Sequence, residues 1–149
     1  MRTYEERLTA PVALWVAIWV GSAALGVAFA AALGPVAGLV ALLVPGVLLS
    51  VVLVRSAAVV RVEDGDLVAG PARIPVAVLG PVEVLDAARS REVRGPASDP
   101  AGYHLIRGWV PAGVLAPVRD PNDPTPYWFV ASRRPAELAA AVDAARISS

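Results

Sequence analysis

The chain has 149 residues and a formal net charge of zero, with thirteen basic residues that are all Arg and thirteen acidic ones. This balance excludes a protein that binds nucleic acid through its phosphates, because such binding needs a basic excess. The chain has no Cys, which excludes disulfides and thiolate sites. A mean hydropathy of +0.60 points instead to a membrane protein, and the surplus of Ala, Val, Gly and Pro is typical of a high-GC bacterial genome.

The first long segment of the chain is apolar. The 47 residues from Leu8 to Val54 include no Asp, Glu, Lys or Arg. A single helix of this length would extend about 70 Å, roughly twice the hydrocarbon thickness of a bilayer. The pair Gly34-Pro35 predicts a turn within it. We therefore expect a transmembrane helical hairpin with spans at Val12–Leu33 and Val36–Val54.

The charges that flank the apolar segment predict its orientation. Arg2 and Arg7 precede the first span, Arg55 and Arg61 follow the second, and the turn between the spans is uncharged. By the positive-inside rule, both chain termini lie on the cytoplasmic side of the cell membrane. The expected organisation is a cytoplasmic N-terminal tail (residues 1–10), a two-span hairpin (11–55) and a cytoplasmic β-domain with a C-terminal helix (56–149).

Small residues recur about every fourth position in the predicted spans. They are Ser22, Gly26 and Ala30 in the first span, and Gly38 and Gly46 in the second. Helices in lipid associate by close backbone approach, which small residues allow. The stripe predicts helix packing within one chain or between chains, so a homo-oligomer is left open. A composition rich in Ala and Gly would also produce such a stripe by chance.

After residue 56 the pattern changes to that of short strands separated by turns. Asp64-Gly65 predicts a β-hairpin, while residues 89–102 and 120–126 have the composition of exposed loops. The seven expected strands lie near Val60–Val62, Leu67, Arg73–Val76, Val82–Ala87, Tyr103–Val110, Val114–Arg119 and Tyr127–Val130.

A single amphipathic helix is predicted after these strands. Pro135 suits the first turn of a helix, and Leu138, Val142 and Ala145 form an apolar stripe of helical period. Strands followed by one closing helix indicate a small antiparallel β-rich domain of the α+β class.

Several motifs of the chain resemble those of a known family. They are Tyr4–Leu8, Ala72–Pro75, Arg94–Pro96, Trp109–Pro111, Asp120–Trp128 and Ser132–Leu138. On these motifs the chain is similar to an uncharacterised family of actinobacterial two-span membrane proteins, a domain of unknown function. This resemblance implies a membrane location and brings no assigned activity. The segment from Phe129 to Ile147 is also similar to the end of bacterial pleckstrin-homology-like (PH-like) domains, which implies a PH-like fold.

No catalytic, cofactor or metal site is predicted. His104 is the only His and has no second His or Cys to complete a ligand set. Asp120, Asn122 and Asp123 are interrupted by Pro and lack the spaced Glu of a calcium loop, so turns explain them better.

The candidate interaction surface combines two basic and three aromatic residues. Arg133 and Arg134 lie beside a predicted helix N-terminus, where they could hold an anion or simply be a solvated pair. Trp109, Tyr127 and Trp128 are the aromatic candidates. Together with Phe129 they are the main aromatic residues of the domain, and strand alternation should bury about half of these four.

The predicted function is non-enzymatic. We expect a hairpin embedded in the lipid bilayer to present the domain at the plasma membrane, where it binds a protein partner as an interaction or scaffold module. One alternative is a module that binds anionic lipid headgroups or senses the membrane. A second is an accessory subunit of a membrane enzyme.

Overall fold

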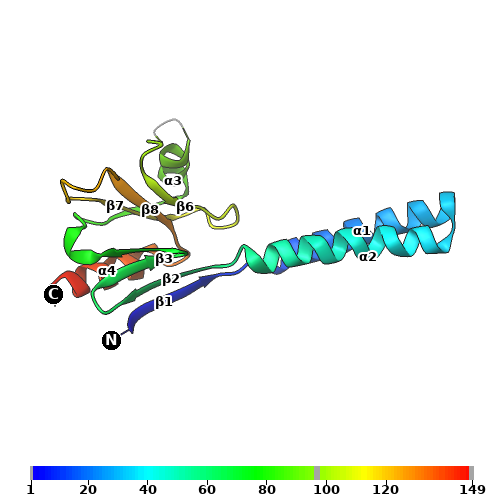
Figure 1. The fold of residues 1–149 in the computed structure, drawn as a ribbon, viewed down its shortest axis with the longest axis horizontal. Coiled ribbons are helices and arrows are strands. Elements are labelled where there is room, and N and C mark those ends of the chain that lie inside the picture. The colour runs from blue at the N-terminus through cyan, green and yellow to red at the C-terminus, as the bar shows by residue number, and fades with distance from the viewer. Residues whose placement is uncertain (1, 96–97, 148–149) are drawn as a thin grey trace. The chain divides into compact units, whose positions relative to one another are not determined.

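The structure is a computed structural model that describes residues 2–95 and 98–147. The chain forms two compact units, one of residues 9–57 and the other of the residues on either side of it. Figure 1 shows one unit as a pair of long helices and the other as a β-domain. Because the first unit interrupts the second, the β-domain is discontinuous in sequence.

The first unit is a helical hairpin. Helix α1 spans Val12–Leu33 and helix α2 spans Pro35–Arg55, so the second helix is one residue longer at each end than the predicted span. Gly34 joins them with a φ of 95°, which favours glycine, and Pro35 then starts α2. By length and composition, both helices are able to cross a membrane.

The first sheet of the β-domain contains four antiparallel strands in the order β1-β2-β3-β4. Its β2–β3 turn is the predicted hairpin: Asp64 and Gly65 have φ values of 51° and 80°, as a type I′ turn requires. Alternate residues of β2 are buried, which matches the period of two in the sequence. The strands are β1 (Arg2–Leu8), β2 (Ala58–Glu63), β3 (Asp66–Ala69) and β4 (Ala72–Pro75).

The second sheet also has four strands, in the order β5-β7-β8-β6. Its pairs are antiparallel except for β6 and β8, which run parallel. A 3-10 turn, η1 (Val76–Val78), precedes the sheet, and helix α3 (Ala87–Arg94) lies between β5 and β6. The strands are β5 (Glu83–Leu85), β6 (Tyr103–Leu105), β7 (Gly113–Pro117) and β8 (Tyr127–Ala131).

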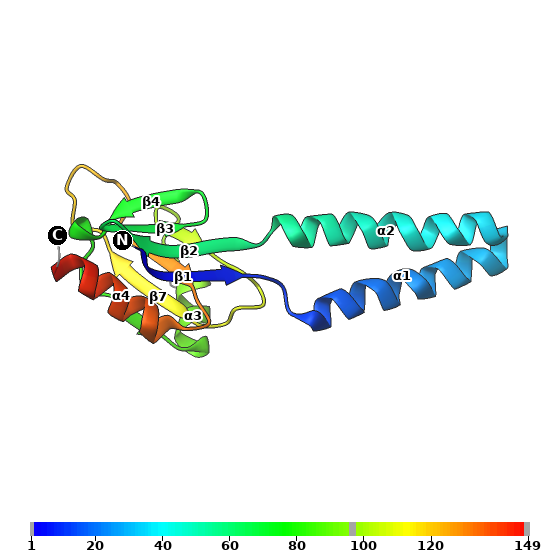
Figure 2. The ribbon, with the colours of Figure 1, turned by 90° about the horizontal axis from the view of Figure 1, so that it is seen from below.

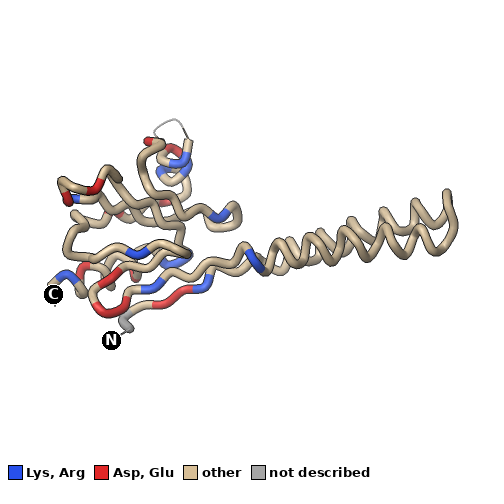
Figure 3. Tube along the Cα trace, viewed as in Figure 1, with Lys and Arg blue, Asp and Glu red and all other residues tan. Residues whose placement is uncertain are grey.

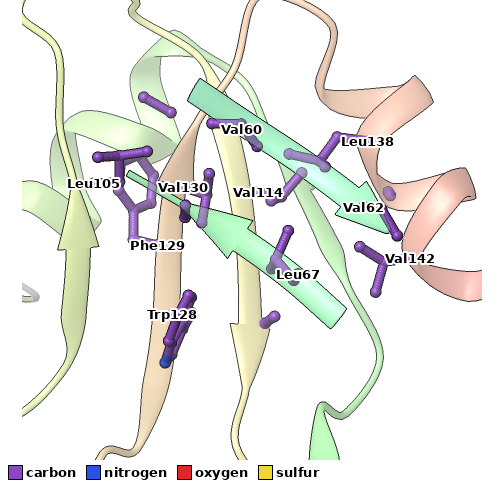
Figure 4. Close-up of a cluster of buried hydrophobic side chains, with 14 of the residues drawn as sticks. Val60, Val62, Leu67, Leu105, Val114, Trp128, Phe129, Val130, Leu138 and Val142 are labelled. Atoms are coloured by element: carbon purple, nitrogen blue, oxygen red, sulfur yellow. The ribbon is translucent and has the colours of Figure 1, made fainter. Parts of the chain in front are cut away.

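Helix α4 (Pro135–Ile147) closes the core. Leu138 and Val142 are fully buried, and Figure 4 shows both pointing towards the side chains of Val60, Val62 and Val114. Figures 1 and 2 both show α4 beside β1 and β2. The predicted C-terminal helix and the coarse α+β class are therefore confirmed.

Three local predictions differ from the structure. Residues 2–8 are strand β1, not part of a tail, because they pair with β2. Residues 89–94, expected as loop, lie in α3 (Ala87–Arg94), whose N-cap Asp86 accepts a hydrogen bond from the Arg89 amide at 2.8 Å. The strand expected at Tyr103–Val110 is β6, which ends at Leu105 because the following residues form a turn.

Candidate functional site

The predicted stripe of small residues forms the contact between α1 and α2. A Cβ built on Gly38 would lie 2.5 Å from Ala30 Cβ and 2.7 Å from Gly26 O, and one on Gly26 would lie 2.9 Å from Leu42 Cβ. Such distances leave no room for a side chain at either glycine. Ser22 is buried in α1, and Gly46 packs against the ring of Trp19. In this structure the stripe packs within one chain.

Gly38→Ala should separate the two helices. The added methyl would clash with the Ala30 methyl and with the backbone oxygen of Gly26, and overpacking of this kind costs about 1–3 kcal/mol. The matched control is Gly21→Ala, because a Cβ there meets nothing within 4 Å. The measurement is disulfide crosslinking between Cys pairs introduced near Ser22 and Gly46. Equal crosslinking in the two variants would contradict tight packing at Gly38.

A buried carboxylate lies where β1 meets the residues that precede α4. Glu6 is only 6% exposed. Its carboxylate accepts hydrogen bonds from Tyr4 Oη at 2.8 Å, Ser132 Oγ at 2.6 Å and the Arg133 amide at 3.0 Å. A buried charge needs several such partners. We call Tyr4, Glu6 and Ser132 the Glu6 cluster.

The Glu6 cluster keeps its tyrosine protonated. Burial raises the pKa of Tyr4 to about 12, and the neighbouring Glu6 carboxylate adds to this effect. A tyrosine is protonated at neutral pH in any case, and the raised pKa keeps the Tyr4 phenol a donor into the alkaline range. Sequence analysis missed Glu6 as a site residue, although the alternation of Tyr4, Glu6 and Leu8 is a signal that places all three on one face of a strand.

Arg133 and Arg134, predicted as part of an interaction surface, bind the backbone of β1. Arg134 donates to the Glu5 carbonyl at 3.1 Å and to the Glu137 carboxylate at 3.0 Å, and its guanidinium lies 5.2 Å from the centre of the Tyr4 ring. Arg133 donates to the Arg7 carbonyl at 3.4 Å. Both side chains thus help to hold β1 in the domain while staying exposed at their other faces.

The three predicted aromatic residues do not form one surface. Trp128 is 5% exposed and its ring lies 4.3 Å from that of Tyr103, so it belongs to the core. Tyr127 starts β8, whereas Trp109 lies beyond the other end of the sheet, after β6. A partner cannot contact all three at once. Of the three, only Trp109 and Tyr127 are partly exposed.

The two sheets are linked through β6. Tyr103 donates a hydrogen bond to the Ala69 carbonyl at 2.6 Å, and burial raises the pKa of its phenol. Nearby, the Tyr127 hydroxyl accepts a hydrogen bond from the Asp99 amide at 2.8 Å and lies 3.4 Å from His104 Nε2. His104 therefore sits among aromatic rings and a backbone loop, which is a structural setting.

The described residues contain no group of three or more His, Cys, Asp and Glu side chains that could hold a metal ion. Asp120 and Asp123 instead make turns: their carboxylates accept the amides of Asn122 and Thr125, each at 2.9 Å. The hydrogen bonds from Thr125 lower the pKa of Asp123. These carboxylates stabilise the β7–β8 loop.

The fold and these contacts define a class: an α+β protein with a pair of candidate membrane-spanning helices inserted between its first two strands. The chain belongs to the family described as "Protein of unknown function (DUF3093)", whose model matches residues 3–142. No curated protein and no solved structure gives a match to the chain. The matched residues include the hairpin, all of β1 except its first residue, and residues 135–142 of α4.

Proposed function

We propose that this chain is a membrane-anchored, non-enzymatic interaction module. Helices α1 and α2 cross the plasma membrane as a hairpin, and the β-domain binds a protein partner at the cytoplasmic face. The observation that carries the proposal is the insertion of the hairpin between two paired strands. Leu8 and Ala58 face each other at the ends of β1 and β2, and the chain between them contains the hairpin.

The connecting segments are very short. Thr9–Pro11 joins β1 to α1, and Ser56–Ala57 joins α2 to β2. Since an extended chain advances at most about 3.6 Å per residue, Val12 lies within about 14 Å of Leu8 and Ala58 within about 11 Å of Arg55. A hairpin in the bilayer would therefore keep the domain close to the headgroups, and both ends of the hairpin would leave the membrane on the same side.

The shape of the domain supports a binding role. Two small sheets closed by a C-terminal helix match PH-like modules in outline, and we propose a PH-like domain on that ground. A fold alone does not define a function.

Single Cys residues test the membrane topology, because the natural chain has none. Ser98 is exposed in the domain, and Val36 lies beside the hairpin turn. With an impermeant thiol reagent and intact cells, Val36→Cys should react and Ser98→Cys should react only after lysis. Labelling of Ser98→Cys in intact cells would invert the topology. Solubility of the full chain without detergent would refute membrane insertion.

Headgroup binding is the second candidate function, favoured by the exposed faces of Arg133 and Arg134. The two candidates differ in their response to salt. Binding to anionic headgroups through Arg weakens steeply as ionic strength rises, whereas an apolar protein interface weakens little. The test is photocrosslinking of protein partners in native membranes, carried out in low and in high salt. Loss of all of them in high salt would favour the second candidate.

A further inference from the structure

One end of the β-domain is marked by the strands that lead to the hairpin. We call it the junction end, defined by the facing residues Leu8 and Ala58. The β3–β4 turn lies there too, because the Gly70 amide donates to the Val59 carbonyl at 2.9 Å. Leu105, the last residue of β6, also lies there: its Cδ1 is 3.2 Å from where a Cβ on Gly70 would be.

The β6–β7 loop, residues 106–112, therefore begins at the junction end. Within the domain, Figures 1 and 2 both show the loop after β6 extending past the β3–β4 turn on the side where β1 ends and β2 begins. The β2–β3 turn and the β7–β8 loop lie at the opposite end of the sheets. They are connected there through η1, because the Val76 amide donates to the Gly65 carbonyl and the Arg119 amide donates to the Val78 carbonyl.

The side chains of the β6–β7 loop suit a membrane interface. Ile106 is one of the few large apolar side chains that the domain exposes, at 38%. Arg107 and the half-buried Trp109 follow it in a turn closed by a hydrogen bond from the Val110 amide to the Arg107 carbonyl at 2.9 Å. An apolar residue, Arg and Trp are the residue types that anchor proteins at headgroup depth.

The Arg107 guanidinium donates one hydrogen bond within the loop, from Nη1 to the Ile106 carbonyl at 2.7 Å. Arg107 Nε and Trp109 Nε1 are buried without a hydrogen-bond partner among the described residues. A buried donor in this state is destabilising. Headgroup phosphate and ester oxygens are acceptors, so contact with a bilayer would let these two side chains turn and form the missing bonds.

Three Arg residues mark the junction end of the domain. Arg7, Arg107 and Arg133 lie at the junction end, Arg133 because it donates to the Arg7 carbonyl. Figure 3 shows acidic residues at the opposite end, on the β2–β3 turn and the β7–β8 loop. Those acidic residues are Glu63, Asp64, Asp66, Asp120 and Asp123. Glu63 and Asp66 form ion pairs with Arg61 and Arg73 at that end, which offsets part of the acidic charge there. An anionic bilayer would attract the Arg residues of the junction end.

We propose that the β6–β7 loop is a second membrane contact, which inserts Ile106 and Trp109 at the bilayer interface and binds anionic lipid phosphates through Arg107. This rests on the proposed function, in which α1 and α2 cross the bilayer. Together with the two short links, the loop makes a third point of attachment. It fixes which face of the domain is turned to the lipid and leaves the acidic end for a cytoplasmic partner.

The test uses the full chain in vesicles of phosphatidylcholine and phosphatidylglycerol that contain nitroxide-labelled lipid. A fluorophore is attached to Gly108→Cys, where a side chain meets nothing within 4 Å. Asn122→Cys is the matched control, exposed in the β7–β8 loop. Val40→Cys, exposed on α2, reports insertion of the hairpin. The nitroxide should quench the labels at Gly108 and Val40 several-fold more than the label at Asn122.

Each outcome separates the two proposals. Quenching at Val40 without quenching at Gly108 would overturn the loop contact and leave the membrane hairpin standing. Equal quenching at Gly108 and Asn122 would also overturn it. No quenching at Val40 would overturn the proposed function and the loop contact with it. Arg107→Gln should reduce quenching at Gly108 in the anionic vesicles to the level found in phosphatidylcholine alone, and an unchanged value would refute phosphate binding by Arg107.

Discussion

Removal of residues 1–8 is expected to unfold the β-domain. Strand β1 pairs with β2 from Arg2↔Glu63 to Leu8↔Ala58, and Leu8 is fully buried. Burial of one such side chain contributes about 1.5–3 kcal/mol. Loss of Glu6 would also leave the Ser132 hydroxyl and the Arg133 amide without their acceptor, at about 1–3 kcal/mol each. These losses approach the 5–15 kcal/mol by which a domain is typically stable.

Two soluble chains test this expectation. The first is the fragment of residues 58–149. The second joins residues 1–8 to 58–149 through Asn-Gly in place of the hairpin, which is feasible because Leu8 and Ala58 are directly opposed in antiparallel strands. By circular dichroism, the joined chain should melt cooperatively and the fragment should not. Cooperative melting of the fragment at the same temperature would show that β1 is dispensable.

The features predicted correctly from the sequence are those with strong local signals. The hairpin follows from an uncharged segment twice as long as a bilayer requires. The Asp64-Gly65 turn follows from the positive φ that a type I′ turn requires of its central residues. Helix α4 follows from the spacing of Leu138 and Val142. In each case neighbouring residues alone carry the information.

The features that the sequence analysis missed depend on distant partners. Glu6 looks like a solvated charge, because its partner Ser132 is 126 residues away in sequence. Strand β1 therefore appeared to be a tail. Trp128 and Phe129 are adjacent and both buried, contrary to simple alternation, because β8 is a central strand covered on both faces. For α3, the Asp86 cap was a local signal, but the helix contains too few apolar residues for a periodic pattern.

Replacement of Leu138 by Asp is expected to unfold most of the domain in the full chain. Leu138 is fully buried against the sheets, and truncation of a packed Leu to Ala already costs about 2–5 kcal/mol. An unpaired carboxylate at this position adds a desolvation cost. Ala140→Asp is the matched control: it introduces the same side chain two residues along α4, at an exposed position. Any loss of helix propensity is therefore common to both variants.

The measurement is the rate of limited proteolysis of the domain in the detergent-solubilised chain, since cleavage follows the population of opened molecules. Leu138→Asp should be cleaved at least tenfold faster than the parent, because each 1.4 kcal/mol raises the opened population about tenfold. Ala140→Asp should resemble the parent. If both variants resist cleavage equally, α4 does not belong to the core. Faster cleavage of Leu138→Asp alone would show that α4 is held in the domain by the face it buries. A helix this short is marginal on its own in water.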